Sequence, residues 1–404
     1  MALPRGIRYV GGGGTSGYGQ AALAHVRLFV NAGIPVHWIP VEWSPQGMKP
    51  SRWSDADGKV KPLLGPLGGG AATSDAAALV AKTARPIPVD TVIAHTPPET
   101  WYQIFEHGKR NLGHLTWETD APPAHWLPLL HRAHAVVVPC RLNREVFQRA
   151  GLRRPIGVVP HVRRHVWTEY SPDDLAATRE DLGIPAQNTV FYSINAWDPR
   201  KDLPRLIAAY ARAFQADDPV TLLIKTQELG YDAGPLYPQR STQALAARIA
   251  GELQVSLGRP LPQIVVHDEE IDSAGIDLIH AIGDVYVSLS RGEGWGLGAF
   301  EAATRGTPVL MTGWGGHTDF LGNDWPGAVP YRLVQTVLWP PYQPSYFPSQ
   351  RWAEADVDAA ARMMRDIVTT PAPARAAALR IREQVVQRYG EPRVWHDWRA
   401  AFDV

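Results

Sequence analysis

Apolar residues in the first 170 positions follow two different periods. Short apolar runs predict buried strands at 7–10, 36–39, 89–94, 112–117, 133–138 and 156–160. Helical spacing follows at 18–31, where Ala22, Val26, Phe29 and Val30 form an apolar face, and again at 143–150. The chain therefore opens as strand, glycine-rich loop, helix and strand, which is how a doubly wound parallel sheet begins.

The same alternation returns in the second part of the chain. Strands are predicted at 189–194, 220–225, 264–267, 284–289 and 308–311. Helices are predicted at 203–214, 241–256, 272–281, 297–305, 353–369 and 373–388. We interpret 43–85 as a long irregular insertion and 325–350 as an ordered loop region. The predicted organisation is an N-terminal Rossmann-like domain (1–170), a C-terminal Rossmann-like domain (171–385) and a tail helix (386–404).

A glycine-rich loop follows the first predicted strand. Gly12, Gly14 and Gly17 form a G-x-G-x-x-G pattern, and Glu42 follows the second strand. This arrangement also occurs in dinucleotide-binding enzymes, so an NAD(P)-dependent oxidoreductase is one open interpretation. The loop lacks the Gly-Lys-Ser/Thr ending of a phosphate-binding Walker loop, which excludes that class.

The most informative stretch lies between a buried strand at 284–289 and a helix at 297–305. Glu293 and Glu301 bracket a glycine-rich turn, which also contains Gly294, Trp295, Gly296 and Leu297. Glycines let a backbone approach a ligand, and a helix N-terminus offers free N–H groups to an anion. A carboxylate accepts two hydrogen bonds at once, which suits the vicinal diol of a ribose or a hexose.

These residues resemble the E-x7-E motif of retaining GT-B glycosyltransferases of family 4. The segments 197–201 (W-D-P-R-K), 306–310 and 314–316 are similar to the same family, and the resemblance extends over most of the chain. It implies an α/β protein of the GT-B fold, with two Rossmann-like domains facing a cleft. The second domain would bind a nucleotide-sugar donor, the first would present the acceptor, and the tail would cross back onto the first domain.

The resemblance also implies roles for donor-binding residues. Arg200 and Lys201 follow a predicted strand, where they would stabilise the diphosphate that leaves during transfer. The family usually has an arginine at the position of Asn195, and Lys225 is a candidate replacement for that missing cation. Gly14 lies in the loop that faces the donor phosphate or the acceptor in this family. Glu301 is expected on the donor diol.

Candidate catalytic groups come from the ends of strands in the first domain. The family usually has a histidine near the transferred sugar at the position occupied here by Glu118. An ionised glutamate only accepts hydrogen bonds, so Glu118 could take the proton of the acceptor hydroxyl or hold a sugar hydroxyl. His95, at the end of another predicted strand, is the second candidate. Glu293 completes the predicted catalytic set.

Composition and charge narrow the class of protein. The 404 residues include one cysteine, so no disulfide framework is possible. No apolar run reaches the roughly 20 residues of a membrane span, and the N-terminus does not resemble a signal peptide. The formal charge of zero divides into +8 for 1–170 and −8 for the remainder. This division fits either an anionic acceptor or membrane surface, or two domains that attract each other across a cleft.

We therefore expect a cytoplasmic glycosyltransferase, with peripheral contact at the inner face of the membrane as a further expectation. The expected reaction moves a hexosyl unit, mannose among the candidates, from a GDP-, UDP- or dTDP-sugar to a glycan, lipid-linked or small-molecule acceptor in polysaccharide biosynthesis. No cofactor, metal or nucleic-acid partner is expected, since no Asp-x-Asp motif appears near the end of a predicted strand and no zinc spacing or basic-aromatic repeat occurs. The alternatives are the oxidoreductase and a non-catalytic nucleotide-sugar-binding scaffold.

Overall fold

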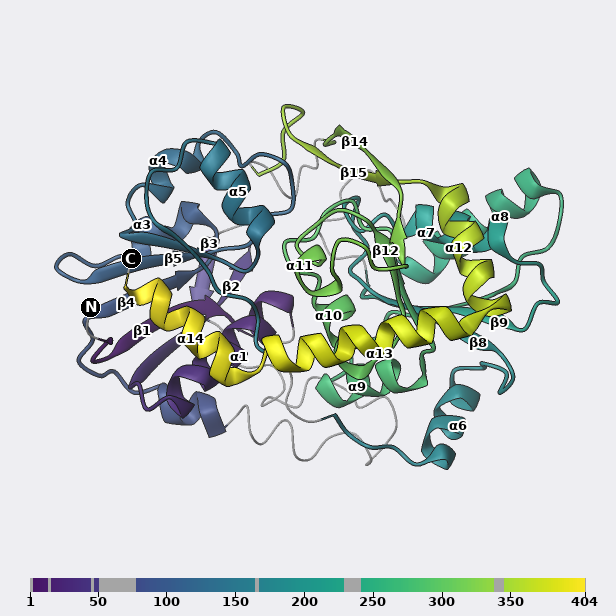
Figure 1. The fold of residues 1–404 in the computed structure, drawn as a ribbon, viewed down its shortest axis with the longest axis horizontal. Helices are drawn as coiled ribbons and strands as arrows, with labels where there is room; N and C mark the ends of the chain where they lie inside the picture. Colours follow the sequence, from purple (N-terminus) through teal and green to yellow (C-terminus); the bar gives the residue numbers. More distant parts are fainter. Residues whose placement is uncertain are drawn as a thin grey trace.

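The computed structural model describes residues 3–13, 16–44, 47–50, 78–163, 167–228, 241–337 and 345–403. Its two large sheets lie side by side, each with helices on its faces, and the last two helices follow one another from the second half to the first (Figure 1). This confirms the predicted α/β architecture. The early loop residue Gly14 and most of the expected insertion, 51–77, lie outside the described residues.

The first sheet has seven strands in the spatial order β3-β2-β1-β4-β5-β6-β7. They are parallel except for β3, which pairs antiparallel with β2. Their bounds are β1 (Ile7–Gly12), β2 (Val36–Ser44), β3 (Gly47–Pro50), β4 (Thr91–His95), β5 (Arg110–His114), β6 (Ala135–Val138) and β7 (Ile156–Val158). The helical segments between them are α1 (Gly17–Asn31), η3 (Pro98–Thr100), α3 (Trp101–Ile104), α4 (Trp126–Leu130) and α5 (Arg141–Arg149).

The second sheet has six parallel strands in the order β10-β9-β8-β11-β12-β13. The strands are β8 (Thr189–Ile194), β9 (Val220–Lys225), β10 (Gln263–His267), β11 (Val285–Ser288), β12 (Val309–Thr312) and β13 (Ala328–Val329). The helices of this half are α6 (Pro172–Asp181), α7 (Leu203–Ala213), α8 (Thr242–Leu257), α9 (Ser273–Ile282), α10 (Leu297–Arg305), α11 (Thr318–Leu321), α12 (Val357–Thr369) and α13 (Pro371–Arg388).

Each sheet reverses its winding direction once, between β1 and β4 in the first sheet and between β8 and β11 in the second. Open α/β sheets bind ligands outside the carboxyl ends of the strands at such a switch point. The carboxyl ends of these four strands carry His95, the last residue of β4, and lead into the glycine-rich loop, Asn195 and the Glu293 turn. The fold therefore gathers the predicted site segments at two sheet edges.

Two predictions of irregular chain were wrong. The start of the expected insertion at 43–85 is regular, since β2 continues to Ser44 and β3 follows at Gly47–Pro50. In addition, 325–350 is not only a loop region, and 353–355 is not helical. Besides β13, the structure has β14 (Tyr331–Gln335), which pairs antiparallel with β15 (Arg351–Ala355), and α12 begins only at Val357. The strand forms in place of a helix because it buries Trp352 and Ala353. The helix begins only after Asp356, whose side chain caps it by accepting the Ala359 N–H. This pair of strands lies at the top of Figure 1 and reaches toward the first half.

The C-terminal helix α14 (Glu391–Phe402) packs on the first sheet, beyond the end of α13 (Figure 1). Its buried face consists of Val394, Trp398, Ala401 and Phe402. Trp398 is completely buried and lies 4.9 Å from the Phe29 ring of α1, centroid to centroid. The last helix thus belongs to the core of the half that contains the N-terminus, so the two halves are tied by chain that crosses between them twice.

Candidate functional site

A cavity of about 600 Å³ lies between the carboxyl edges of the two sheets. The first half contributes residues from α1 and from the loops after β4 and β5. The second half contributes the loops after β8 and β11 and the start of α10. Of the thirteen predicted site residues, eleven line this cavity: His95, Glu118, Asn195, Arg200, Lys201, Glu293, Gly294, Trp295, Gly296, Leu297 and Glu301.

The glycine-rich turn is shaped by the opposite half of the chain as well as by its own helix. Gly296 has φ of 86° and precedes α10, a backbone conformation that side chains with a Cβ rarely adopt. At Gly294, an added Cβ would come within 1.9 Å of Thr116 Cγ2. The glycine at 294 therefore allows the turn to pack against the segment after β5, a role that the sequence analysis did not anticipate.

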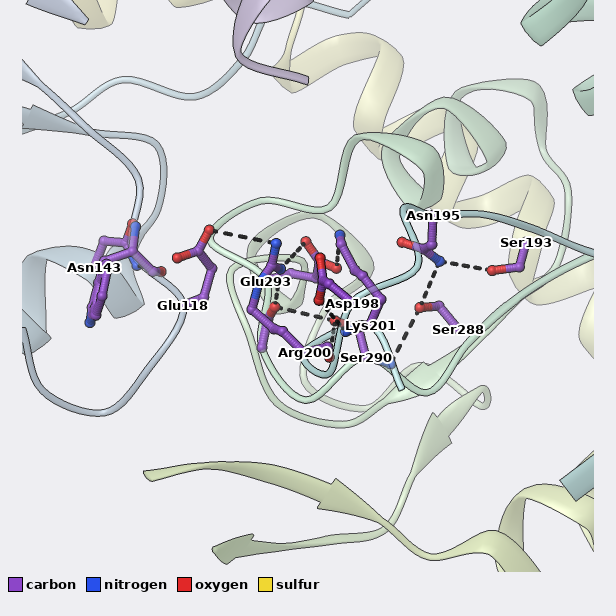
Figure 2. Close-up of polar contacts among 12 residues, drawn as sticks. Glu118, Asn143, Ser193, Asn195, Asp198, Arg200, Lys201, Ser288, Ser290 and Glu293 are labelled. Atoms are coloured by element: carbon purple, nitrogen blue, oxygen red, sulfur yellow. Dashed lines mark hydrogen bonds and ion pairs between the residues drawn. The ribbon is translucent and has the colours of Figure 1, made fainter. Parts of the chain in front are cut away.

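Glu293 is the anionic centre of the turn. Its carboxylate lies 2.5 Å from Lys201 Nζ and 3.4 Å from Arg200 Nη1 (Figure 2). All three side chains are largely buried, with exposed fractions of 9 to 18%. Burial alone would raise the pKa of Glu293, but Lys201 and Arg200 outweigh it and lower this pKa to about 2. Glu293 is therefore ionised at neutral pH and holds both cations at the cavity.

The loop that carries these cations is fixed by backbone and side-chain bonds. The Lys201 N–H donates to Asp198 Oδ1 at 3.0 Å, and the Arg291 N–H donates to the Arg200 carbonyl at 2.7 Å. Arg291 also pairs with Asp202 at 2.8 Å. The loop after β8 and the turn after β11 are thus locked together, which presents Arg200 and Lys201 in a defined position.

Asn195 and Lys225 occupy different environments. Asn195 lines the cavity, and its amide donates to Ser193 Oγ at 2.8 Å and Ser288 Oγ at 3.3 Å (Figure 2). Lys225 is not among the described residues that line the cavity. Its ammonium donates to the carbonyls of Thr226 and Glu269, and burial lowers its pKa to about 8. Lys225 is therefore poorly placed to replace the cation that Asn195 lacks.

Glu301 is oriented by a pair of buried side chains behind it. The Tyr192 hydroxyl lies 2.8 Å from His280 Nδ1, and His280 Nε2 lies 3.2 Å from Glu301 Oε2. If the phenol donates to Nδ1, the proton of the neutral imidazole sits on Nε2 and points at the carboxylate. This tautomer would fix one oxygen of Glu301 at the cavity wall.

Glu118 belongs to the first half of the chain and lies close to Arg200 of the second half. The Tyr346 hydroxyl donates to Glu118 Oε2 at 3.2 Å, and Arg200 Nη2 lies 4.0 Å from Oε1. Burial and the nearby Glu293 raise the pKa of Glu118, and Arg200 only partly opposes them. Asn143 of α5 holds the backbone before Glu118 through its side-chain amide. Its Oδ1 accepts from the Trp117 N–H at 2.9 Å, and its Nδ2 donates to the Trp117 carbonyl at 2.7 Å.

His95 lies deeper than Glu118. It is 1% exposed, stacks on His114 at 3.9 Å between ring centroids, and lies beneath Tyr18 at 5.3 Å. The Tyr9 hydroxyl lies 2.7 Å from its Nδ1. Burial lowers the pKa of His95 to about 3, so the ring is neutral at physiological pH. It supports the inner end of the cavity, whereas Glu118 reaches its interior.

Trp295 and Leu297 line the cavity but are also packing residues. Trp295 is 2% exposed and packs against Phe300 and Phe320 at 5.2 and 5.1 Å. Leu297 lies opposite Gly17, whose added Cβ would meet its Cδ1 at 3.5 Å. Trp295 therefore anchors the turn in the core of the second half, and Leu297 lies against the early glycine loop.

Several residues at the site were not predicted, among them Tyr192, His280 and Tyr346. Tyr192 belongs to a strand and His280 to a helix whose apolar pattern gave no sign of a polar contact between them. Tyr346 comes from the segment that was expected to be a loop, more than two hundred positions from Glu118 along the chain. No local signal marks such pairs, because only the folded topology brings them together.

A scan against protein-family models matches residues 51–397 to a family described as "Family 4 Glycosyltransferase in conflict systems". The chain belongs to this glycosyltransferase family. The match confirms the resemblance carried by the motif residues and argues against the oxidoreductase interpretation. No curated protein matches the sequence.

Solved structures with the same fold extend over nearly the whole glycosyltransferase. HepE of Anabaena, in complex with UDP and glucose, aligns with a TM-score of 0.62 and 16% identity over 99% of both chains. Sucrose-phosphate synthase from Thermosynechococcus elongatus aligns with a TM-score of 0.60 and 19% identity, over 99% of this chain and 98% of that one. An E. coli structure described as trehalose-6-phosphate bound with UDP-2-fluoro glucose aligns with a TM-score of 0.62 and 12% identity, over 98% of both chains. These similarities confirm the GT-B fold.

Two further observations concern the described part of the glycosyltransferase. None of its helices there combines the length and hydrophobicity needed to span a bilayer. No three His, Cys, Asp or Glu side chains within those same ranges are arranged to hold a metal ion.

Proposed function

We propose that this glycosyltransferase transfers a hexosyl unit from a nucleotide-diphosphate sugar to an acceptor hydroxyl, with retention of anomeric configuration and without a metal ion. The observation that carries the proposal is the cluster of Arg200, Lys201 and Glu293, formed by the loop after β8 and the turn before α10, with Glu118 of the first half 4.0 Å from Arg200. Cations are needed where a diphosphate leaves, and a carboxylate is needed where an acceptor proton is lost.

The donor would lie against the second half of the chain. Glu301 would accept hydrogen bonds from the ribose diol, with one oxygen fixed by His280. Arg200 and Lys201 would face the diphosphate, together with the N–H groups at the start of α10. Asn195 would offer its amide in place of the family's arginine. Glu293 would keep both cations oriented through its ion pairs before the donor binds.

In the transfer step, the acceptor hydroxyl oxygen forms a bond to the anomeric carbon. The bond between that carbon and the diphosphate oxygen breaks, and the nucleoside diphosphate leaves with the electron pair. Glu118 would take the proton of the acceptor hydroxyl. The pKa of Glu118 is raised toward neutral pH, so the ionised carboxylate is a stronger base than that of an ordinary glutamate.

A binding panel tests the donor proposal. Thermal shifts with UDP, GDP and dTDP should show stabilisation by at least one of them, because a ligand that binds only the folded state raises its stability. UDP heads the panel because several structures of the same fold contain uridine nucleotides. A protein that none of the three stabilises would contradict the proposal.

The Glu301→Ala variant should bind the selected nucleoside diphosphate at least about tenfold more weakly, because a charge-assisted hydrogen-bond pair is worth about 1.5–3 kcal/mol. Titration calorimetry measures the dissociation constant. The matched control is Glu180→Ala, which removes an exposed carboxylate of α6 and should leave affinity unchanged. Equal affinity in wild type and Glu301→Ala would remove Glu301 from the donor site.

The Lys201→Ala variant should weaken binding of the nucleoside diphosphate more than binding of the nucleoside alone. The reason is that the lysine interacts with the phosphates and not with the base or ribose. The two dissociation constants, each compared with wild type, give the result. A similar loss for both ligands would show that Lys201 acts only by supporting the fold of the site.

A further inference from the structure

The first half of the chain forms one complete wall of the cavity. This wall, which we term the acceptor wall, consists of Tyr18 and Gln20 from α1, Thr116 and Glu118 after β5, and His95 and His161 at the inner end. Tyr346 of the second half extends it. Within this wall, Glu118 lies 4.0 Å from Arg200 of the second half.

The acceptor wall carries negative charge despite the basic character of the first half. Of the described first-half residues that line the cavity, Glu118 is the one with a formal charge at neutral pH. Burial lowers the pKa of His95 to about 3 and of His161 to about 4, so both imidazoles are neutral. An anionic acceptor would meet a carboxylate in a region of reduced dielectric, where like charges repel strongly.

The cations of the second half offset this charge only in part, because Arg200, which lies 4.0 Å from Glu118, is shared with Glu293. Lys201 is paired with Glu293, and Arg200 donates to the Gly292 carbonyl and pairs with the same carboxylate. Both face the position proposed for the donor diphosphate. A phosphate group on the acceptor would have to compete with the donor diphosphate for Arg200 and Lys201.

The other groups of the acceptor wall suit hydroxyls and the apolar face of a sugar ring. The Tyr18 hydroxyl bonds to Thr116, and its partly exposed ring lies between that residue and His95. Tyr346 stacks on Trp117 at 5.4 Å with an interplanar angle of 20° and directs its hydroxyl at Glu118. Aromatic faces pack on sugar rings, and a carboxylate accepts hydrogen bonds from hydroxyls.

We propose that the acceptor is an uncharged, hydroxyl-bearing sugar, not a phosphorylated or otherwise anionic one. This inference rests on the proposed function and names the acceptor class of the same site. It assigns Glu118 a second role, because the carboxylate that takes the acceptor proton also repels an anionic acceptor. The basic charge of the first half therefore lies outside the described acceptor wall and does not select the substrate.

The test compares matched acceptor pairs: glucose with glucose 6-phosphate, and mannose with mannose 6-phosphate. The donor is the nucleotide sugar whose nucleoside diphosphate stabilises the protein most, and product formation is followed by mass spectrometry. We expect the uncharged member of at least one pair to give a kcat/KM at least about tenfold higher, equivalent to about 1.4 kcal/mol. Equal or faster use of the phosphorylated members would overturn the inference, as would failure of every uncharged sugar to accept.

Two variants identify the source of the discrimination. Glu118→Gln should lower transfer to both members of a pair. It should also bring the ratio of their kcat/KM values closer to one, because the charge that repels the phosphorylated member is gone. Asp120→Asn removes a nearby carboxylate that pairs with Arg351 at 2.8 Å and does not line the described cavity, so the ratio should stay at the wild-type value. An unchanged ratio in Glu118→Gln would overturn the inference. A protein that binds no nucleoside diphosphate would instead contradict the proposed function itself.

Discussion

Replacing Glu118 by glutamine is expected to lower turnover roughly 10²–10⁴-fold, the usual loss when a general base is removed. Glutamine keeps the shape of the side chain and its contact with Tyr346, but it cannot accept a proton from the acceptor. Affinity for the nucleoside diphosphate should change much less, since the donor is proposed to lie against the second half of the chain and Glu118 belongs to the first. Steady-state kinetics and calorimetry on the same preparation measure both quantities.

The pH profile separates this role from a structural one. A carboxylate base works when ionised, so wild-type turnover should fall as the pH drops through the pKa of Glu118, which burial raises above the ordinary glutamate value. Glu118→Gln should lose this acidic limb along with most of its turnover. Near-normal turnover in the variant would rule out Glu118 as the base and leave His95 as the remaining candidate of the first half.

Replacing Glu293 by glutamine is expected to lower the free energy of unfolding by roughly 3 kcal/mol at neutral pH. The pKa of Glu293 falls from an ordinary 4.5 to about 2 in the folded protein, and each pKa unit corresponds to about 1.4 kcal/mol. Glutamine would also leave Lys201 and Arg200 without their buried counter-charge. Urea denaturation of both proteins at pH 7 gives the difference.

The stability that the ionised Glu293 contributes depends on pH because its pKa is lower in the folded protein than in the unfolded chain. The folded-state pKa is lowered, so the stability from Glu293 is fully present above 4.5 and is lost as the pH falls toward 2. The difference in free energy of unfolding between wild type and Glu293→Gln should therefore become smaller below pH 4.5. A gap that stays constant down to pH 2, or that is absent at pH 7, would show that the ion pairs contribute little. The exposed variant Glu180→Gln of α6 is the control and should follow wild type throughout.

Hydrophobic periodicity was enough to predict most of the regular fold. The strands at 189–194 and 220–225 and the helix at 297–305 were predicted with their observed bounds, because each is a clear apolar pattern between turn residues. The strands β14 and β15 were missed. Their stability depends on pairing with each other and on Trp352 burial, which no local pattern reveals. The predicted domain boundaries at 170 and 385 remain interpretations.

The site was predictable where chemistry is local in sequence and not where it depends on contacts between distant segments. Glu293, Arg200 and Lys201 belong to recognisable motifs, and the fold brings them together. Lys225 was proposed from its place at a strand end, but its side chain turns to backbone carbonyls outside the described cavity wall. The contact of Tyr346 with Glu118 joins segments 228 positions apart, which is beyond any sequence pattern.

The most direct test of the account is consumption of a nucleotide sugar. UDP-glucose, GDP-mannose and dTDP-glucose are each incubated with the protein and a mixture of uncharged sugars, and the released nucleoside diphosphate is quantified. The account predicts release from at least one donor, with a glycosylated product of matching amount, and near-complete loss of both in Lys201→Ala and Glu301→Ala. Binding of a nucleoside diphosphate without release from any donor would contradict it and support a nucleotide-sugar-binding scaffold instead.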